Sequence, residues 1–298
     1  MIYTVTLNPA LDYTVYLKHL AVGETNRASR AVLSPGGKGI NVSAVLAALG
    51  EPTIALGFVA GVTGEIFRQM LAEAAVGEEL ITLSSGVTRI NMKIKAGAET
   101  EINAMGPAVD ERALDRLLVQ LSKMKAGDTL VLAGSVPASL PADMYRRLAE
   151  TALPLGVRLV VDAARDWLLP TLACRPFLIK PNRAELSEMV GRVLETDAEV
   201  EAAAKELQAA GARNVLVSLG GDGALLLDET GTVHRASAAR GEAINTVGAG
   251  DAMVAGFLCG VSKGYAYALR MAIAAGSATA FREGLADAAC IYATLQEL

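Results

Sequence analysis

The stretch Thr129-Leu130-Val131-Leu132, followed by Val157-Arg158-Leu159-Val160-Val161, decides the fold class of this chain. Both are short runs of aliphatic and β-branched residues, as expected of buried strands. The segment between them, about residues 142–152, has the spacing of an amphipathic helix. A strand, a helix and a second strand form a βαβ unit with parallel strands. The pattern therefore predicts a parallel sheet covered by helices.

The same alternation extends outward from this unit, from about residue 107 to the last residue, and a further strand is expected at residues 1–7. The fold class predicted is α/β, with a doubly wound, mostly parallel sheet flanked by helices. Ligands of such sheets bind at the carboxyl ends of the strands. The remaining expected elements are strands at 177–179, 214–218, 224–228 and 232–234, helices near 42–49, 110–123, 182–190 and 198–210, and three alanine-rich helices after residue 252.

Residues 13–33 and 88–105 break this alternation. They contain short segments of alternating polar and apolar residues, such as Arg89–Lys95 and Thr100–Asn103, which are typical of exposed strands. We expect a small separate sheet that lies over the strand ends as a lid, and a core of residues 1–12, 34–87 and 106–298. The alternative is that these segments are edge strands of the main sheet.

Composition excludes several classes of protein. The chain has 298 residues, a formal net charge of −5 and no basic cluster, which argues against binding to nucleic acid. No apolar run approaches the roughly 20 residues that span a membrane. The N-terminus lacks the pattern of a signal peptide, and the three cysteines are far apart in the sequence. We therefore expect a cytoplasmic protein that does not bind membranes.

The segment Asn245-Thr246-Val247-Gly248-Ala249-Gly250-Asp251-Ala252 precedes an apolar helix expected over 253–261. Small residues at a helix start leave backbone N–H groups open, and the helix dipole favours an anion there. The amides of Gly248, Ala249 and Gly250 could stabilise a phosphoryl group in transfer, and Asp251 could accept the proton of an alcohol. A glycine-rich turn with an ordinary helix cap is an equally good interpretation.

A second glycine cluster, Gly36-Gly37-Lys38-Gly39-Ile40-Asn41, allows a close backbone approach to a ligand, with a charge at Lys38 and an amide at Asn41. The spacing is not that of a Walker A loop, and no dinucleotide-binding motif follows the first strand. A tight turn before a helix would need the same residues.

Three other segments lie where strands end. Asn182 and Glu185 could hold a hydrated Mg²⁺, or they could form a capping box. Ser218–Gly223 could approach nucleotide phosphates, or it could be a simple hairpin turn. Asp12 follows the first strand and could accept hydrogen bonds from sugar hydroxyls, or it could cap a turn. Arg27, Arg89 and Lys93 in the lid could bind a phosphate or could face solvent.

Taken in order, the motifs of the chain resemble those of the ribokinase/PfkB family of carbohydrate kinases. The likeness covers essentially the whole sequence, and TLNP, GGKGIN and TRIN are similar to those of the branch with the fructose-1-phosphate and tagatose-6-phosphate kinases. The motifs are TLNPALD (6–12), GGKGINVS (36–43), TRINMKI (88–94), EINAMGP (101–107), AGSVPASLP (133–141), IKPNRAEL (179–186), VSLGGDGA (217–224) and NTVGAGDA (245–252).

The resemblance implies a role for each matching position. Asp251 would be the catalytic base, and the amides of Gly248, Ala249 and Gly250 would form the anion hole. The sugar phosphate would be bound by Asp12, Arg27, Gly36, Gly37, Lys38, Asn41, Arg89, Asn91 and Ser135, with Lys93 as a further candidate. ATP would be bound by Lys180, Asn182, Glu185, Ser218, Gly220, Gly221, Asp222 and Gly223, and Asn182 and Glu185 would hold Mg²⁺ through water.

The resemblance also implies the reaction: ATP-dependent phosphorylation of fructose 1-phosphate at its 6-hydroxyl, by a homodimer formed through the lid. Tagatose 6-phosphate and fructose 6-phosphate are alternative acceptors. From another class, a sugar-phosphate sensor without catalysis would keep the pocket but would not need Asp251 and its glycines.

Overall fold

The main sheet explains where a ligand can bind. The computed structural model describes residues 1–298 apart from the side chain of Ala98. The sheet has the order β14-β13-β12-β11-β10-β9-β1-β4-β5, with β6 also paired to β4. All neighbouring strands are parallel except at the edge formed by β12, β13 and β14. Its strands are β1 (Ile2–Thr6), β4 (Thr53–Val59), β5 (Gly77–Glu78), β6 (Ile81–Thr82), β9 (Thr129–Ala133), β10 (Arg158–Asp162), β11 (Leu178–Ile179), β12 (Asn214–Ser218), β13 (Ala224–Leu227) and β14 (Val233–Ala236).

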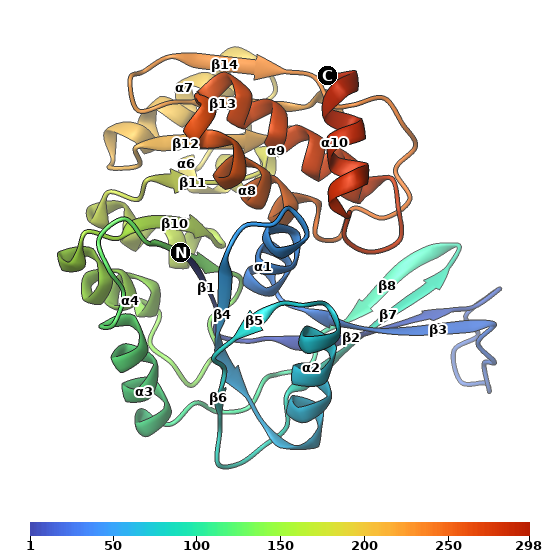
Figure 1. Cartoon of the computed structure of the whole chain (residues 1–298). Coiled ribbons are helices and arrows are strands. Elements are labelled where there is room, and N and C mark those ends of the chain that lie inside the picture. Colours follow the sequence, from blue (N-terminus) through green and yellow to red (C-terminus); the bar gives the residue numbers. More distant parts are fainter.

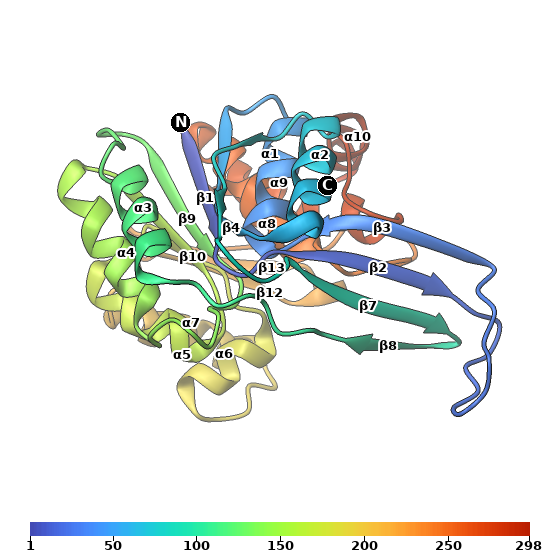
Figure 2. The same ribbon diagram turned by 90° about the horizontal axis from the view of Figure 1, so that it is seen from below.

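Helices cover both faces of this sheet, as a doubly wound fold requires (Figure 2). One face carries α1 (Lys38–Ala48), α8 (Ala249–Gly260), α9 (Tyr265–Ala280) and α10 (Ala288–Glu297), with α2 (Gly61–Glu73) beside α1. The other carries α3 (Glu111–Leu121), α4 (Met144–Ala152), α5 (Arg165–Leu168), α6 (Arg183–Val190) and α7 (Asp197–Ala209). Short 3₁₀ turns are η1 (Leu153–Leu155), η2 (Leu169–Cys174), η3 (Gly220–Asp222) and η4 (Val261–Lys263).

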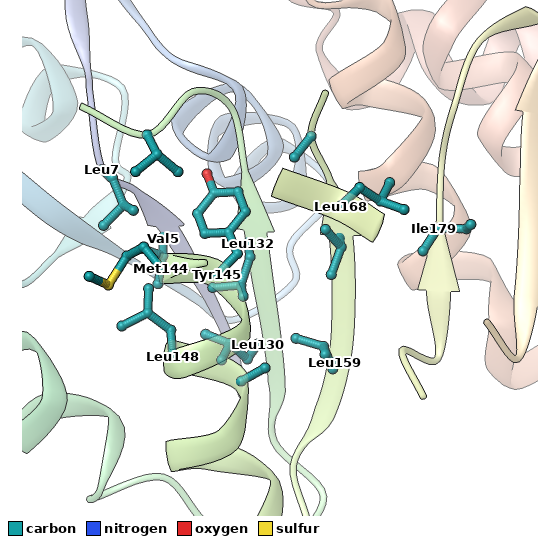
Figure 3. Packing of buried hydrophobic residues seen from close by; sticks show 14 of the residues in the cluster. Val5, Leu7, Leu130, Leu132, Met144, Tyr145, Leu148, Leu159, Leu168 and Ile179 are labelled. Carbon is teal, nitrogen blue, oxygen red and sulfur yellow. The ribbon is translucent and has the colours of Figure 1, made fainter. Parts of the chain in front are cut away.

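The apolar core holds the strand ends in place. Figure 3 shows Tyr145 and Leu148 of α4 packed towards Leu130 and Leu132 of β9. The Tyr145 ring is fully buried, and its hydroxyl donates to the carbonyl oxygen of Gly134, just after β9, at 3.1 Å. Core packing therefore fixes the backbone at the carboxyl end of a central strand. Among the described residues, no helix combines the length and the hydrophobicity that a membrane crossing requires.

A second sheet of four strands projects from the body of the molecule (Figure 1). Its strands are β2 (Ala10–Tyr16), β3 (Arg30–Gly36), β7 (Arg89–Ala96) and β8 (Ala98–Ile102), in the order β3-β2-β7-β8. The prediction of a small separate sheet is confirmed, and the alternative of edge strands is wrong. We refer to this sheet and the loop over residues 17–29 as the lid.

Several expected boundaries were wrong. Strand β2 begins at Ala10 and β3 ends at Gly36, so Asp12 lies within the lid rather than at the end of the first strand, which stops at Thr6. Helix α1 begins at Lys38 rather than Val42, and α8 begins at Ala249 rather than Met253. In both cases glycines with low helix propensity form the first turn. The elements β4, α2, β5 and β6 were not predicted.

Candidate active site

A cleft of about 680 Å³ opens where the carboxyl ends of the central strands meet the inner face of the lid. It collects residues from the ends of β1, β9, β11 and β12 and from the first turns of α1 and α8. This is the place where open α/β sheets bind ligands. Residues predicted from sequence that line it are Asp12, Gly37, Lys38, Asn41, Arg89, Ser135, Lys180, Asn182, Glu185, Ser218, Gly248, Gly250 and Asp251.

The first turn of α8 places a carboxylate beside free backbone amides. Gly248 is the N-cap residue, with a φ of 80° that favours glycine, and no side chain caps the helix. The amide of Ala249 donates to the carbonyl of Thr246 at 3.2 Å, which leaves those of Gly248 and Gly250 as the candidates for binding an anion. Asp251 follows in the same turn and lines the cleft.

The environment of Asp251 makes its carboxylate a stronger base than an ordinary aspartate. The side chain is 6% exposed and accepts a hydrogen bond from the Asn41 amide at 2.8 Å. Burial and the nearby charge of Asp162 raise the pKa of Asp251 to about 7, while Lys38, the Asn41 hydrogen bond and Lys180 act in the opposite direction. A base with this pKa is suited to accepting a proton near neutral pH.

Two lysines lie close to this turn, and both contact the buried carboxylate of Asp162. Oδ1 of Asp162 is 3.1 Å from Lys38 Nζ and 3.6 Å from Lys180 Nζ. Burial lowers the pKa of Lys38, but Asp162, Asp251 and Glu185 together raise it above the usual lysine value. The cleft therefore has positive charge beside the uncapped N-terminus of α8.

The lid supplies the opposite wall of the cleft. The Asp12 carboxylate on β2 forms an ion pair with Lys93 on β7 at 3.0 Å and accepts a hydrogen bond from the Asn91 amide at 3.0 Å. Lys93 and Asn91 are buried behind Asp12, so they orient it rather than line the cleft. Gly36 lies against the same carboxylate, because a Cβ there would be 2.7 Å from Asp12 Oδ2.

Arg89 and Ser135 belong to a cluster of polar residues near the carboxyl ends of β1 and β9. The Arg89 guanidinium donates to the carbonyl of Asn8 at 2.8 and 3.2 Å, and the Asn8 amide donates to the Ser135 hydroxyl at 3.4 Å. These contacts hold a guanidinium and a hydroxyl on one side of the cleft, a combination suited to a phosphate.

Asn182 and Glu185 form a capping box at the start of α6. The Asn182 side chain accepts from the Glu185 amide and the Glu185 carboxylate accepts from the Asn182 amide, each at 2.8 Å. The structural alternative is thus confirmed. It leaves the other Glu185 oxygen, Oε1, 4.0 Å from Lys38 Nζ, and both capping residues line the cleft. A carboxylate oxygen at this position fits a hydrated Mg²⁺.

A second cleft of about 550 Å³ adjoins the first. Ser218, Gly220, Gly221, Gly223 and Ala249 line it, together with residues of the 238–246 segment and of α9. Ser218 and Gly250 line both clefts, so the two share a wall at the start of α8. The pair can hold two different ligands side by side.

Besides Gly36, Asn91 and Lys93, which contact Asp12 from behind, two predicted residues line neither cleft. Arg27 is exposed in the 17–29 loop of the lid, and Asp222 is exposed on η3, where its carboxylate lies 3.7 Å from Arg183. Neither is among the described residues that line the clefts. The sequence of a glycine-rich turn or a long loop does not indicate whether a charged side chain points towards a cleft or towards solvent.

Sequence reasoning also missed residues that the fold places at the site. Asn8, Glu101, Asn103 and Trp167 line the first cleft, and Asp162 lies just behind it. Asp162 gave a usable signal, since it is a charged residue directly after an expected buried strand, where ligand sites gather.

Comparisons with known proteins agree with this arrangement. The family model described as "pfkB family carbohydrate kinase" matches residues 5–290. The chain is 43% identical over 300 residues to the 1-phosphofructokinase of Bacillus subtilis, covering 100% of this chain and 98% of that protein. It is 37% identical to the D-tagatose-1-phosphate kinase of Bacillus licheniformis, covering 100% and 98%.

Solved structures give the same result for the fold. The structure of phosphofructokinase-2 from Escherichia coli in complex with substrates and products superposes with a TM-score of 0.93 at 30% identity, over 99% of this chain and 98% of that one. The family match, the full-length relatives and the geometry of the cleft lead to one conclusion: this chain belongs to the pfkB family of carbohydrate kinases.

Proposed function

We propose that this kinase transfers the γ-phosphoryl group of ATP to the 6-hydroxyl of fructose 1-phosphate, giving fructose 1,6-bisphosphate. The observation that carries the proposal is the buried Asp251 carboxylate, which lines the first cleft directly after Gly250, a residue that borders both clefts at the uncapped N-terminus of α8. The full-length relatives named 1-phosphofructokinase support the choice of acceptor.

The reaction follows from what each wall of the cleft offers. Asp251 accepts the proton of the 6-hydroxyl as its oxygen bonds to the γ-phosphorus, while the bond from that phosphorus to the β,γ-bridging oxygen breaks and ADP leaves. The amides of Gly248 and Gly250, with that of Ala249 if it releases Thr246, bind the charge on the phosphoryl oxygens. Lys38 and Lys180 add positive charge at the same place.

The sugar phosphate is oriented by the lid and by the sheet. Asp12 and Asn41 bind hydroxyls of the sugar, and Gly37 allows its close approach. Arg89 and Ser135 bind the phosphate already present, which places the free hydroxyl towards Asp251. ATP occupies the second cleft, along the backbone of Gly220, Gly221 and Gly223.

Mg²⁺ fits the same arrangement. Glu185 and Asn182 would hold it through water, and when bound it neutralises charge on the polyphosphate.

A comparison of acceptors tests the proposal. Purified protein with Mg·ATP should have a higher kcat/KM for fructose 1-phosphate than for fructose 6-phosphate, tagatose 6-phosphate or tagatose 1-phosphate. Tagatose 1-phosphate is included because a relative bears the name D-tagatose-1-phosphate kinase. A clear preference for any other acceptor would refute the assignment of substrate, and binding without turnover of any of them would indicate a sensor.

The proposal includes a homodimer formed through the lid. Apolar residues form a row across the exposed face of the lid, because the register pairs Leu33 with Tyr13, Tyr13 with Met92, and Met92 with Ile102. Tyr13, Met92 and Ile102 are 37%, 38% and 56% exposed, and Ile90 beside them is 46% exposed. An apolar sheet face of this kind is typical of a protein interface.

Light scattering tests this part. The wild type should have the mass of a dimer, and Met92→Lys with Ile102→Lys should shift it to that of a monomer. Val193→Lys, at an exposed apolar residue outside the lid, is the matched control and should leave the mass unchanged. A monomeric wild type would contradict the dimer and leave the proposed reaction untouched.

A further inference from the structure

Asp162 is a buried carboxylate whose surroundings need an explanation. It is the last residue of β10, it is 1% exposed, and it does not line the cleft. A buried charge is unfavourable unless it is paired, and Asp162 is paired with two lysines at once. Its other oxygen, Oδ2, has no hydrogen-bond partner among the described residues. Lys180 and Lys38 hold the pKa of Asp162 below its usual value despite burial, so it is an anion.

Both lysines that contact Asp162 also line the first cleft, near the first turn of α8. Lys180 is 4% exposed, and its Nζ lies 3.0 Å from the position that a Cβ on Gly250 would occupy. Lys38 is the first residue of α1 and lines the same cleft. A lysine in the first turn of a helix is disfavoured by the helix dipole, and the carboxylates of Asp162 and Glu185 near Lys38 offset this.

We propose that Asp162 is a positioning residue that holds the ammonium groups of Lys38 and Lys180 beside the anion hole, and thereby sets the charge that the transferring phosphoryl group meets. Asp162 carries one negative charge against the two ammonium groups that it contacts, and Glu185 Oε1 lies 4.0 Å from that of Lys38. The inference deepens the proposed function and rests on it.

The arrangement has a second consequence for the base. The negative charge of Asp162 raises the pKa of Asp251, whereas Lys38, Lys180 and the Asn41 amide lower it, and these are the groups that face Asp251 from β10, α1 and the end of β11. Removing the Asp162 charge should therefore make Asp251 ionise at lower pH. A residue with a merely structural role would not move this ionisation.

The test compares Asp162→Asn with the wild type. Loss of the anchor for both lysines should lower kcat about 10–100-fold, with a smaller change in the KM for the sugar phosphate, because interactions made only in the transition state are lost. The acidic limb of the kcat/KM–pH profile should move to lower pH. The Mg²⁺ concentration for half-maximal activity should stay unchanged.

A matched control is Asp228→Asn. Asp228 is also buried, at 3% exposed, and its carboxylate binds His234 at 2.7 Å at the far edge of the main sheet, away from both clefts. This variant should lose stability but keep kcat and the pH profile of the wild type.

A triple variant keeps the inference testable if Asp162→Asn fails to fold. Asp162→Asn with Lys38→Met and Lys180→Met removes the buried carboxylate together with both of its lysine partners, so neither lysine is left without its counter-charge. If Asp162 acts through the lysines, kcat of the triple variant should lie within about threefold of that of Lys38→Met with Lys180→Met, because coupled residues are not additive. A further tenfold loss would overturn the inference.

Two other results would overturn it. One is a folded Asp162→Asn with the kcat and pH profile of the wild type. The other is a rise in the Mg²⁺ requirement that accounts for the whole loss, which would make Asp162 part of a metal site. Wild type assayed in parallel separates the two proposals: an inactive wild type refutes the proposed function, whereas an active wild type beside a fully active variant refutes only the role of Asp162.

Discussion

The first turns of α1 and α8 have the same construction but carry opposite charges. Both helices have a glycine N-cap with positive φ, 123° at Gly37 and 80° at Gly248, and neither has a side-chain cap. The two helices pack against each other on one face of the sheet, and the Asn41 amide of α1 donates to Asp251 of α8. Within the first turn, α8 has an aspartate as its third residue and α1 has a lysine as its first.

Only one of these charges agrees with the helix dipole. An aspartate in a first turn is favoured, whereas a lysine there is disfavoured and is retained because Asp162 and Glu185 lie next to it. The comparison teaches that a local electrostatic conflict with a dedicated counter-charge indicates a functional residue. In the mechanism proposed above, α8 supplies the base and the amides, and α1 supplies charge and orientation.

The largest loss of kcat is expected when Asp251, the acidic residue of the α8 first turn, is replaced. Asp251→Asn keeps the size and the Asn41 contact but removes the base, so kcat should fall about 10³–10⁴-fold. Calorimetric binding of the sugar phosphate should change little. A variant that turns over like the wild type would mean that another group accepts the proton.

Replacing the glycine N-cap of α8 should lower catalysis, whereas replacing a glycine N-cap far from the clefts should lower only stability. In Gly248→Ala, the new Cβ would lie 2.7 Å from Leu285 Cδ2 in a backbone conformation that alanine disfavours, so the open amides should shift and kcat should fall about 10²–10³-fold. Steady-state kinetics and thermal unfolding measure the two effects separately.

Gly264→Ala is the matched control. Gly264 is the N-cap of α9 with a φ of 102°, and a Cβ there would have nothing within 4 Å. We expect a loss of about 1–3 kcal/mol in the free energy of unfolding, because the backbone of Gly264 (φ 102°, ψ 159°) is in a region that essentially only glycine adopts, with kcat unchanged. Equal loss of kcat in both variants would show that cap strain, not the anion hole, explains the first result.

Replacing Lys38, the basic residue of the α1 first turn, should lower activity less than replacing Asp251. Lys38→Met removes one positive charge but keeps Lys180, so kcat/KM for the sugar phosphate should fall about 10–100-fold. Lys263→Met, a lysine of η4 outside both clefts, should behave as the wild type. Retention of full activity in Lys38→Met would restrict the role of α1 to Asn41.

The smallest effect concerns the contact between the two helices. The pKa of Asp251 is about 7, so kcat/KM of the wild type should fall as the pH drops below 7 and the base becomes protonated. The Asn41 hydrogen bond lowers this pKa, so in Asn41→Ala the acidic limb should move to higher pH, with a loss of about tenfold or less at pH 6. A limb that moves to lower pH would contradict the assigned direction.

Much of the fold could be predicted because the sequence alternates between buried strands and helices. The strands near 129–133 and 158–162 and the pairing of Asn182 with Glu185 follow local rules of burial and capping. The lid could also be predicted, since its strands alternate in the manner of a sheet with one exposed face. The starts of α1 and α8 were placed too late, because glycine-rich first turns look like loops until their contacts with the sheet are known.

The site was harder to predict where it depends on distant contacts. Asp162 meets Lys38 across 124 residues and Lys180 on the neighbouring strand, and only the strand order brings the three together. Asp222 belongs to a motif and Arg27 was assigned from the family resemblance, yet both are exposed, on a turn and in a long loop of the lid.

The wall shared by the two clefts has a stereochemical consequence. Ser218 and Gly250 border both of them, so the acceptor oxygen and the leaving ADP can face the same phosphorus from opposite sides. A single displacement in this geometry inverts the configuration of a chiral phosphorus centre. ATP labelled at its γ-phosphate with three oxygen isotopes should therefore give a product of inverted handedness, whereas a route with two successive transfers would give retention.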